Sequence, residues 1–228
     1  MYSTLQKLSA EFIGTFALVF CGVGAVCANE FLHGSGSGPV GAALAVGLIV
    51  AILYTGLARV SGGHFNPAVT IGFWVTKRIG TFEVFGYWIV QLLGAIAAAS
   101  LMRWIIPDDT WTRALGGTPT LVADFTRLPA MALEAILTFF LVLVFFAVLP
   151  SQDNEPSAVS GWAVGLAYTV GILVAGPFTG GVLNPARAFG PALASSHWNN
   201  HGVYWVGPLA GGFLAGLLYD AVFAKKTV

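Results

Sequence analysis

The tripeptide Asn-Pro-Ala occurs twice in this sequence, and each copy carries the elements of a polar site. The copies are Asn66-Pro67-Ala68 and Asn184-Pro185-Ala186. Asn is a favoured N-cap and Pro is favoured at the first helical position, so each copy predicts the start of a helix. A helix N-terminus carries about half a positive charge, and the Asn side chain adds amide N–H donors. If the two starts meet, a passing water oxygen would accept two hydrogen bonds there with its protons pointing away, while cations would be repelled.

The rest of the sequence is too apolar for a soluble domain. Of its 228 residues, 57% are hydrophobic and 9% are charged, with a mean hydropathy of +0.81, whereas an ordinary soluble domain has about 25% charged residues. The formal net charge is zero and there is no basic stripe, which excludes a nucleic-acid-binding protein. A membrane span needs about 20 apolar residues, so the length predicts a membrane protein of about six spans.

Six long apolar segments are predicted to be transmembrane helices. They cover residues 6–28, 40–60, 82–105, 129–149, 157–176 and 202–222. Apolar and polar residues do not alternate along them, which argues against a β-barrel. The first segment is longer than a signal-peptide core and contains Glu11, so we predict that it is retained. Two apolar stretches, 67–75 and 185–194, follow the tripeptides and are too short to span, which predicts re-entrant half-helices.

The second half of the chain repeats features of the first. The matching pairs are Asn66 with Asn184, Gly47-Leu48 with Gly165-Leu166, Tyr87-Trp88 with Tyr204-Trp205, and Glu11 with Glu134. Each half holds three spans, an odd number, so the second half must be inserted upside down. We therefore predict a single channel domain over 1–228, built from inverted repeats of about 1–115 and 120–228, with its substrate path at the midplane.

The basic residues near the span ends predict the orientation in the membrane. With six spans, one side carries Lys7, Arg59, Lys77, Arg78, Lys225 and Lys226. That side is expected to be cytoplasmic, with both termini inside. The short termini favour a bacterial plasma (inner) membrane.

The sequence resembles the major intrinsic proteins, the aquaporins and glycerol facilitators. The resemblance covers the whole chain and rests on the repeat, on the motif Ser-Gly-Gly-His-Phe-Asn-Pro-Ala-Val-Thr at 61–70, and on Asn-Pro-Ala-Arg at 184–187. It implies an all-α membrane protein with six transmembrane helices and two half-helices, a homotetramer with one pore per subunit, and no enzymatic activity. Arg187 would line the outer constriction, where its guanidinium offers donors to solutes and repels cations; the alternative is an Arg that reaches the outer interface.

The other constriction positions of the family can be located in this sequence by counting back from each Asn of the two tripeptides. They fall on Val46, Ile172 and Gly181, which join Arg187. Water-selective members have an aromatic residue, a His, a small residue and Arg there, and glycerol facilitators have Trp, Gly, Phe and Arg. This ring is instead similar to nodulin-type channels that pass boric acid and to bacterial channels linked with arsenite. We predict a wider, more apolar ring that passes water and small uncharged solutes such as glycerol, urea, boric acid and arsenous acid; the alternative is a water-selective aquaporin.

Three polar residues within or beside the spans have two interpretations each. Glu11 and Glu134 are either coupling sites of an ion-driven secondary transporter or acceptors for half-loop backbone N–H groups, and the resemblance favours the second. His64 is either a pH gate in the pore or a hydrogen-bonding group that fixes the loop, and its place in the shared motif favours the loop. A coupled transporter is thus the rival from another class, and it would accumulate solute, whereas a channel only equilibrates it.

The sequence gives no reason to expect an enzyme, a cofactor or a metal. No paired nucleophile and base and no His–Glu metal spacing occur in the spans. Cys21 and Cys27 lie on one predicted helix, turned away from each other, and are expected to be two buried small hydrophobic side chains. The expected partners are water, small neutral solutes, the lipid bilayer and other copies of the chain.

Overall fold

The computed structural model describes residues 2–148 and 158–224. The described residues form helices, and six of these helices are long and apolar enough to cross a membrane. They are α1 Thr4–Phe31, α2 Gly38–Ser61, α4 Thr81–Ile105, α6 Arg127–Ala147, α7 Ala158–Thr179 and α9 Val203–Leu218, the last continued by the π-helical turn η2 Tyr219–Phe223. The predicted all-α fold with six spans is confirmed, and the boundaries differ by a few residues. Residues 149 and 157, at two predicted span ends, and Lys225 and Lys226 lie outside the described residues.

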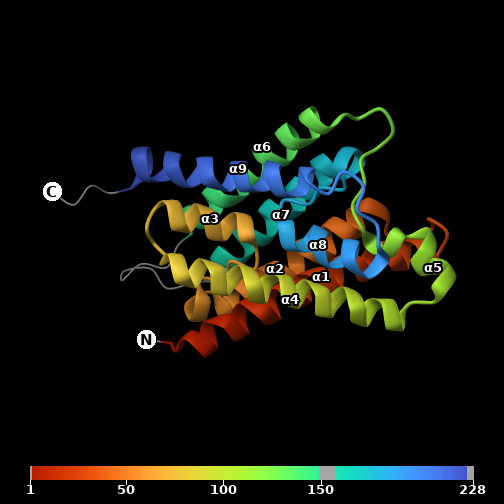
Figure 1. Ribbon diagram of the computed structural model, residues 1–228, viewed down its shortest axis with the longest axis horizontal. Coiled ribbons are helices and arrows are strands. Elements are labelled where there is room, and N and C mark those ends of the chain that lie inside the picture. Colours follow the sequence, from red (N-terminus) through yellow and green to blue (C-terminus); the bar gives the residue numbers. More distant parts are fainter. Residues whose placement is uncertain (1, 149–157, 225–228) are drawn as a thin grey trace.

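The two short helices begin where the tripeptides predict. Asn66 is the N-cap of α3 Pro67–Val75, and Asn184 is the N-cap of α8 Pro185–Ser195. Each Asn side chain accepts a hydrogen bond from the first turn of its own helix, and each Pro occupies the first helical position. Figure 1 shows α3 and α8 one after the other along the long axis of the molecule, between α9 and α4.

The packing follows the repeat. Helix α1 packs on α4 as α6 packs on α9, while α3 packs on α9 and α8 packs on α4, so each half-helix lies against the other half of the chain. The remaining pair, α2 and α7, cross where Gly47 faces Gly165: a Cβ added at Gly47 would lie 2.6 Å from the Gly165 carbonyl oxygen. Glycines let the two backbones approach closely in lipid, where packing replaces the hydrophobic effect.

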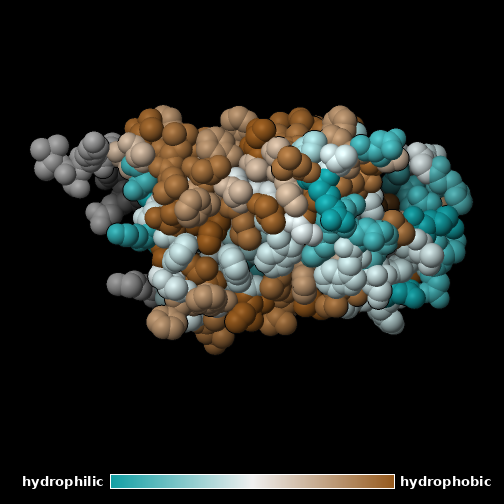
Figure 2. Space-filling model, turned by 45° about the horizontal axis from the view of Figure 1, so that its top comes forward, coloured by the Kyte–Doolittle hydropathy of each residue, from teal (hydrophilic) through white to brown (hydrophobic). Residues whose placement is uncertain are grey.

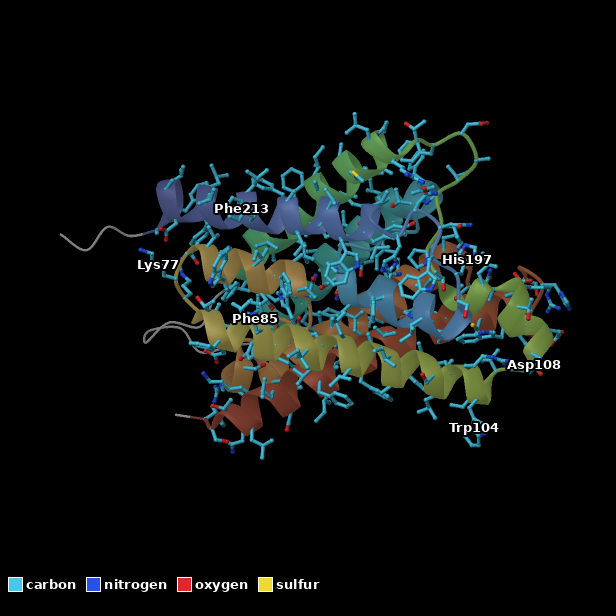
Figure 3. All side chains as sticks on the ribbon, in the orientation of Figure 1. Lys77, Phe85, Trp104, Asp108, His197 and Phe213 are labelled. Carbon is cyan, nitrogen blue, oxygen red and sulfur yellow. The ribbon has the colours of Figure 1, made fainter. Side chains whose placement is uncertain are left out.

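On the face shown in Figure 2, apolar side chains cover much of the left and central parts, with residues of intermediate hydropathy between them, and hydrophilic side chains gather at the right end. Lys77 lies at one end of the molecule, and Asp108 and His197 lie at the other (Figure 3). The second end includes a short helix and a turn that the sequence analysis did not predict, α5 Asp108–Arg113 and η1 Leu115–Gly117. They belong to the connection between α4 and α6, which joins the predicted spans 82–105 and 129–149.

Candidate functional site

The two half-helix starts meet at the centre of the molecule, and hydrogen bonds join them. The Asn66 side-chain Nδ2 donates to the carbonyl oxygen of Leu183 (2.9 Å), and the Asn184 Nδ2 donates to the carbonyl oxygen of Phe65 (2.9 Å). Each amide thus binds the half-loop of the opposite repeat. The arrangement aims two helix N-termini, with their partial positive charges, at one region.

A tyrosine from α7 lies at the same point. Its hydroxyl accepts a hydrogen bond from Asn66 Nδ2 at 2.8 Å, and Asn184 lies near that hydroxyl. No local pattern in the sequence marks this residue, Tyr168, and the sequence predicts instead that both amides donate to a passing water. Its counterpart in the first half, at the same distance before Asn66, is Val50, and this apolar residue gives no sign of a polar group at that position.

The carboxylate of Glu11 is fully buried and holds the first half-loop. One oxygen accepts from the Ser61 hydroxyl (2.7 Å) and the backbone N–H of His64 (2.9 Å). The other accepts from the backbone N–H of Phe65 (2.6 Å) and from the Gln91 side chain (2.8 Å). Groups that have no helical partner thereby receive an acceptor inside the protein.

Glu134 does the same for the second half-loop. One oxygen accepts from the Thr179 hydroxyl (2.6 Å) and the backbone N–H of Val182 (2.9 Å), and the other accepts from the N–H of Leu183 (2.7 Å). Leu183 and its counterpart Phe65 both have positive φ, 55° and 50°. Such a backbone costs free energy for a side-chain-bearing residue and persists where the surroundings hold it, which these carboxylates do.

His64 lies in the first half-loop with its ring among other side chains. It is 2% exposed, its Nδ1 is 3.1 Å from the Thr70 hydroxyl, and its ring packs on Phe73 and Tyr87 at centroid distances of 4.3 and 5.3 Å. A cavity of about 490 Å³ opens from the end near Lys7 and reaches His64.

The four predicted constriction residues come together on the other side of the centre. The Arg187 guanidinium donates to the carbonyl oxygen of Gly181. A Cβ added at Gly181 would lie 2.7 Å from Ile172 Cα, and one added at Gly22 would lie 3.1 Å from Val46 and 3.7 Å from Arg187. Residues far apart in the sequence are thus assembled around one guanidinium.

The loop between α4 and α6 covers this assembly, an arrangement that no pattern in the sequence predicts. Residues 117–120 line a cavity of about 190 Å³ together with Arg187. The Thr118 hydroxyl lies 2.8 Å from that of Ser195 in α8, and the N–H of Val122 donates to Phe178 of α7 at 2.9 Å. Loops carry no periodicity that would show where they fold back.

These features define a class of protein: an α-helical membrane protein of two inverted halves, in which half-helices from each half meet at a polar centre between two cavities. In this class the path for the solute lies where the halves meet.

The chain belongs to the major intrinsic protein family, whose family model matches residues 1–219. It is 41% identical over 228 residues to aquaporin TIP4-4 of Zea mays, covering 97% of this chain and 88% of that protein. It is 38% identical over 230 residues to aquaporin TIP2-1 of Arabidopsis thaliana, with the same coverages. The X-ray structure of the aquaglyceroporin from Plasmodium falciparum superposes with a TM-score of 0.81 at 26% identity, covering 97% of this chain and 98% of that one.

The protein is therefore a multi-pass membrane protein that forms a passive channel for water and small solutes, and it is not an enzyme. Both of these aquaporin relatives are plant proteins, which gives no support to the bacterial source that the short termini suggested.

Proposed function

We propose that the channel conducts water together with small uncharged solutes that carry hydroxyl or amide groups, glycerol, urea, boric acid and arsenous acid among them. The observation that carries this proposal is the outer ring. Val46, Ile172 and Gly181 bring neither an aromatic ring nor an imidazole to the side chain of Arg187. Such a ring is wider than one that contains an aromatic side chain and a His. Three of its sides are apolar, and the Arg187 guanidinium provides fixed hydrogen-bond donors on the fourth.

Ions are excluded by charge and by the cost of dehydration. A cation would meet the positive ends of α3 and α8 and the guanidinium of Arg187, and it would lose its hydration shell in the ring. Uncharged solutes avoid this penalty because they exchange hydrogen bonds with water for hydrogen bonds with the protein.

A water-selective aquaporin is the second candidate, and one contact favours it. The Tyr168 side chain lies at the meeting point of the half-helices, 2.8 Å from Asn66, and narrows the path at a place where the outer ring has no influence. An ion-coupled transporter is a poorer fit, because Glu11 and Glu134 already accept hydrogen bonds from the half-loops with both oxygens.

The assembly and orientation are proposed from the family and the charges. The chain forms a homotetramer with one pore per subunit, and the end with Lys7, Lys77 and Arg78 faces the cytoplasm. The kind of membrane, for which the sequence favoured a bacterial plasma membrane, stays a prediction.

Stopped-flow measurements on proteoliposomes test the solute range. We expect water, and at least one of glycerol, urea and boric acid, to equilibrate at rates proportional to protein content and without any ion gradient. Permeability to water alone would refute the proposed solute range and favour the water-selective channel. Accumulation of solute against its gradient would refute the channel and favour the transporter.

A further inference from the structure

The centre of the pore is asymmetric although the fold around it is not. Val50 on α2 and Tyr168 on α7 occupy equivalent positions of the two repeats. Both side chains are 1% exposed, and the Tyr168 hydroxyl meets Asn66 where the inverted halves join. The repeat thus pairs a small apolar side chain in the first half with a ring that ends in a hydroxyl in the second, and the hydroxyl reaches the centre.

The hydroxyl takes the place that a permeating molecule needs. Asn66 has two amide N–H groups, of which one is donated to the Leu183 carbonyl and the other to the Tyr168 hydroxyl. Asn184 donates to the Phe65 carbonyl and has the same hydroxyl as a neighbour. A solute oxygen that is to be held by the central amides must replace the Tyr168 hydroxyl at Asn66.

The burial of the two asparagines agrees with a centre that is already occupied by protein groups. Asn66 and Asn184 are both 0% exposed. The cavity that reaches His64 lies on one side of them, and a cavity lined by Ile172 and Arg187 lies on the other. Neither asparagine lines either of these two cavities, and the Tyr168 side chain is buried with them, 1% exposed and bound to Asn66.

We propose that Tyr168 is a specificity-determining residue at the centre of the pore: its ring sets the width that a solute must pass, and its hydroxyl competes with the solute for the amide donors of Asn66. The proposal rests on the proposed channel function and adds a second barrier to the outer ring. A water molecule needs to displace only the hydroxyl, since it offers an equivalent acceptor. A solute of glycerol size must displace the ring as well, so the centre discriminates by size even where the outer ring is wide.

Two substitutions separate the ring from the hydroxyl. Tyr168→Val installs the side chain of the equivalent position, Val50, and we expect glycerol and urea permeability to rise about tenfold or more, with a smaller rise for water. Tyr168→Phe keeps the ring and frees an Asn66 donor, and we expect water permeability to change by about twofold to tenfold with little change in solute permeability. Leu166→Ala, on the same helix at a side chain that is 52% exposed, is the control and should change neither.

Permeabilities to water, glycerol and urea would be measured in proteoliposomes with equal amounts of folded protein. An unchanged glycerol-to-water ratio in Tyr168→Val refutes the role of the ring, and unchanged water permeability in Tyr168→Phe refutes the role of the hydroxyl. The second test remains if the Val variant does not fold. If the parent passes water only and Tyr168→Val also passes glycerol, the proposed solute range fails while the role of Tyr168 stands. If the parent and Tyr168→Val pass glycerol equally well, the proposed solute range stands while the role of Tyr168 fails.

Discussion

Replacing Glu134 by Leu should destabilise the protein by removing the acceptor that holds the second half-loop. The backbone N–H groups of Val182 and Leu183 would both lose their partner in a buried place. An unsatisfied buried donor costs about 1–3 kcal/mol, so the two together predict a loss of about 2–6 kcal/mol in folding free energy. Thr179 adds little, because its hydroxyl also lies 3.3 Å from the Ala175 carbonyl oxygen and keeps that partner.

Glu134→Gln should be much milder because it keeps one acceptor oxygen. With the amide oxygen in place of Oε1, the bonds from Thr179 and Val182 are retained, and only the N–H of Leu183 loses its partner. The expected cost is about 1–3 kcal/mol. Since the carboxylate holds a loop and carries no proton or cation for transport, the folded Gln variant should still conduct.

Stability would be measured by the tryptophan fluorescence of purified protein during unfolding, and conduction by stopped flow on the same preparations. Glu83→Gln is the matched control, since Glu83 pairs with Lys7 at 2.8 Å near the surface, where a pair contributes about 0–1 kcal/mol. A Leu variant as stable as the parent would contradict the structural role. A Gln variant that folds normally but has lost all transport would point to coupling instead.

Three further outcomes are expected. Asn66→Asp puts a negative charge beside the helix N-termini and should raise cation leak in patch-clamp or liposome flux recordings; an unchanged leak would count against a pore at this place. Val46→Phe with Ile172→His refills the outer ring and should reduce glycerol and urea permeability several-fold while sparing water, and equal losses for all three would show that the ring does not select. Burial lowers the pKa of His201, and its Nε2 accepts from Trp205 Nε1 at 3.0 Å, which requires the neutral imidazole. This bond should persist at neutral pH and be lost only on acidification below the ordinary His range of about 6.5, and a change in tryptophan fluorescence already at higher pH would contradict it.

The helices and half-helices were predictable because their signals are local. Asn66-Pro67 and Asn184-Pro185 combine an N-cap with a proline at the first helical position, and the structure has helix starts at both places. The long apolar segments were equally clear. In lipid every backbone N–H and C=O group needs a hydrogen-bond partner within the protein, and apart from a closed β-barrel only a helix provides one. The short helix Asp108–Arg113 was missed, because six residues without a long apolar run give no comparable signal.

The site was predictable only in part. Counting from the asparagines predicted that Val46, Ile172, Gly181 and Arg187 form one ring. The structure places Gly181 beside Ile172 and Arg187, and Val46 beside Gly22, which also lies near Arg187; that these residues form the constriction stays a prediction. Counting of this kind works only where the resemblance says how many residues before the Asn a site residue lies. For Tyr168 no such position was known, and a tyrosine in an apolar helix looks like any other buried aromatic side chain.

The sequence by itself determined the class of protein, the number of spans, the inverted repeat and the two polar helix starts, because each follows from composition or from neighbours along the chain. Only the tertiary structure decided which groups the central amides bind. Asn66 and Tyr168 are 102 residues apart, and their contact depends on how α7 is turned against α2. The two backbones approach each other closely at Gly47 and Gly165. Whether an amide donor is left for a solute is therefore a property of helix packing, which no local pattern contains.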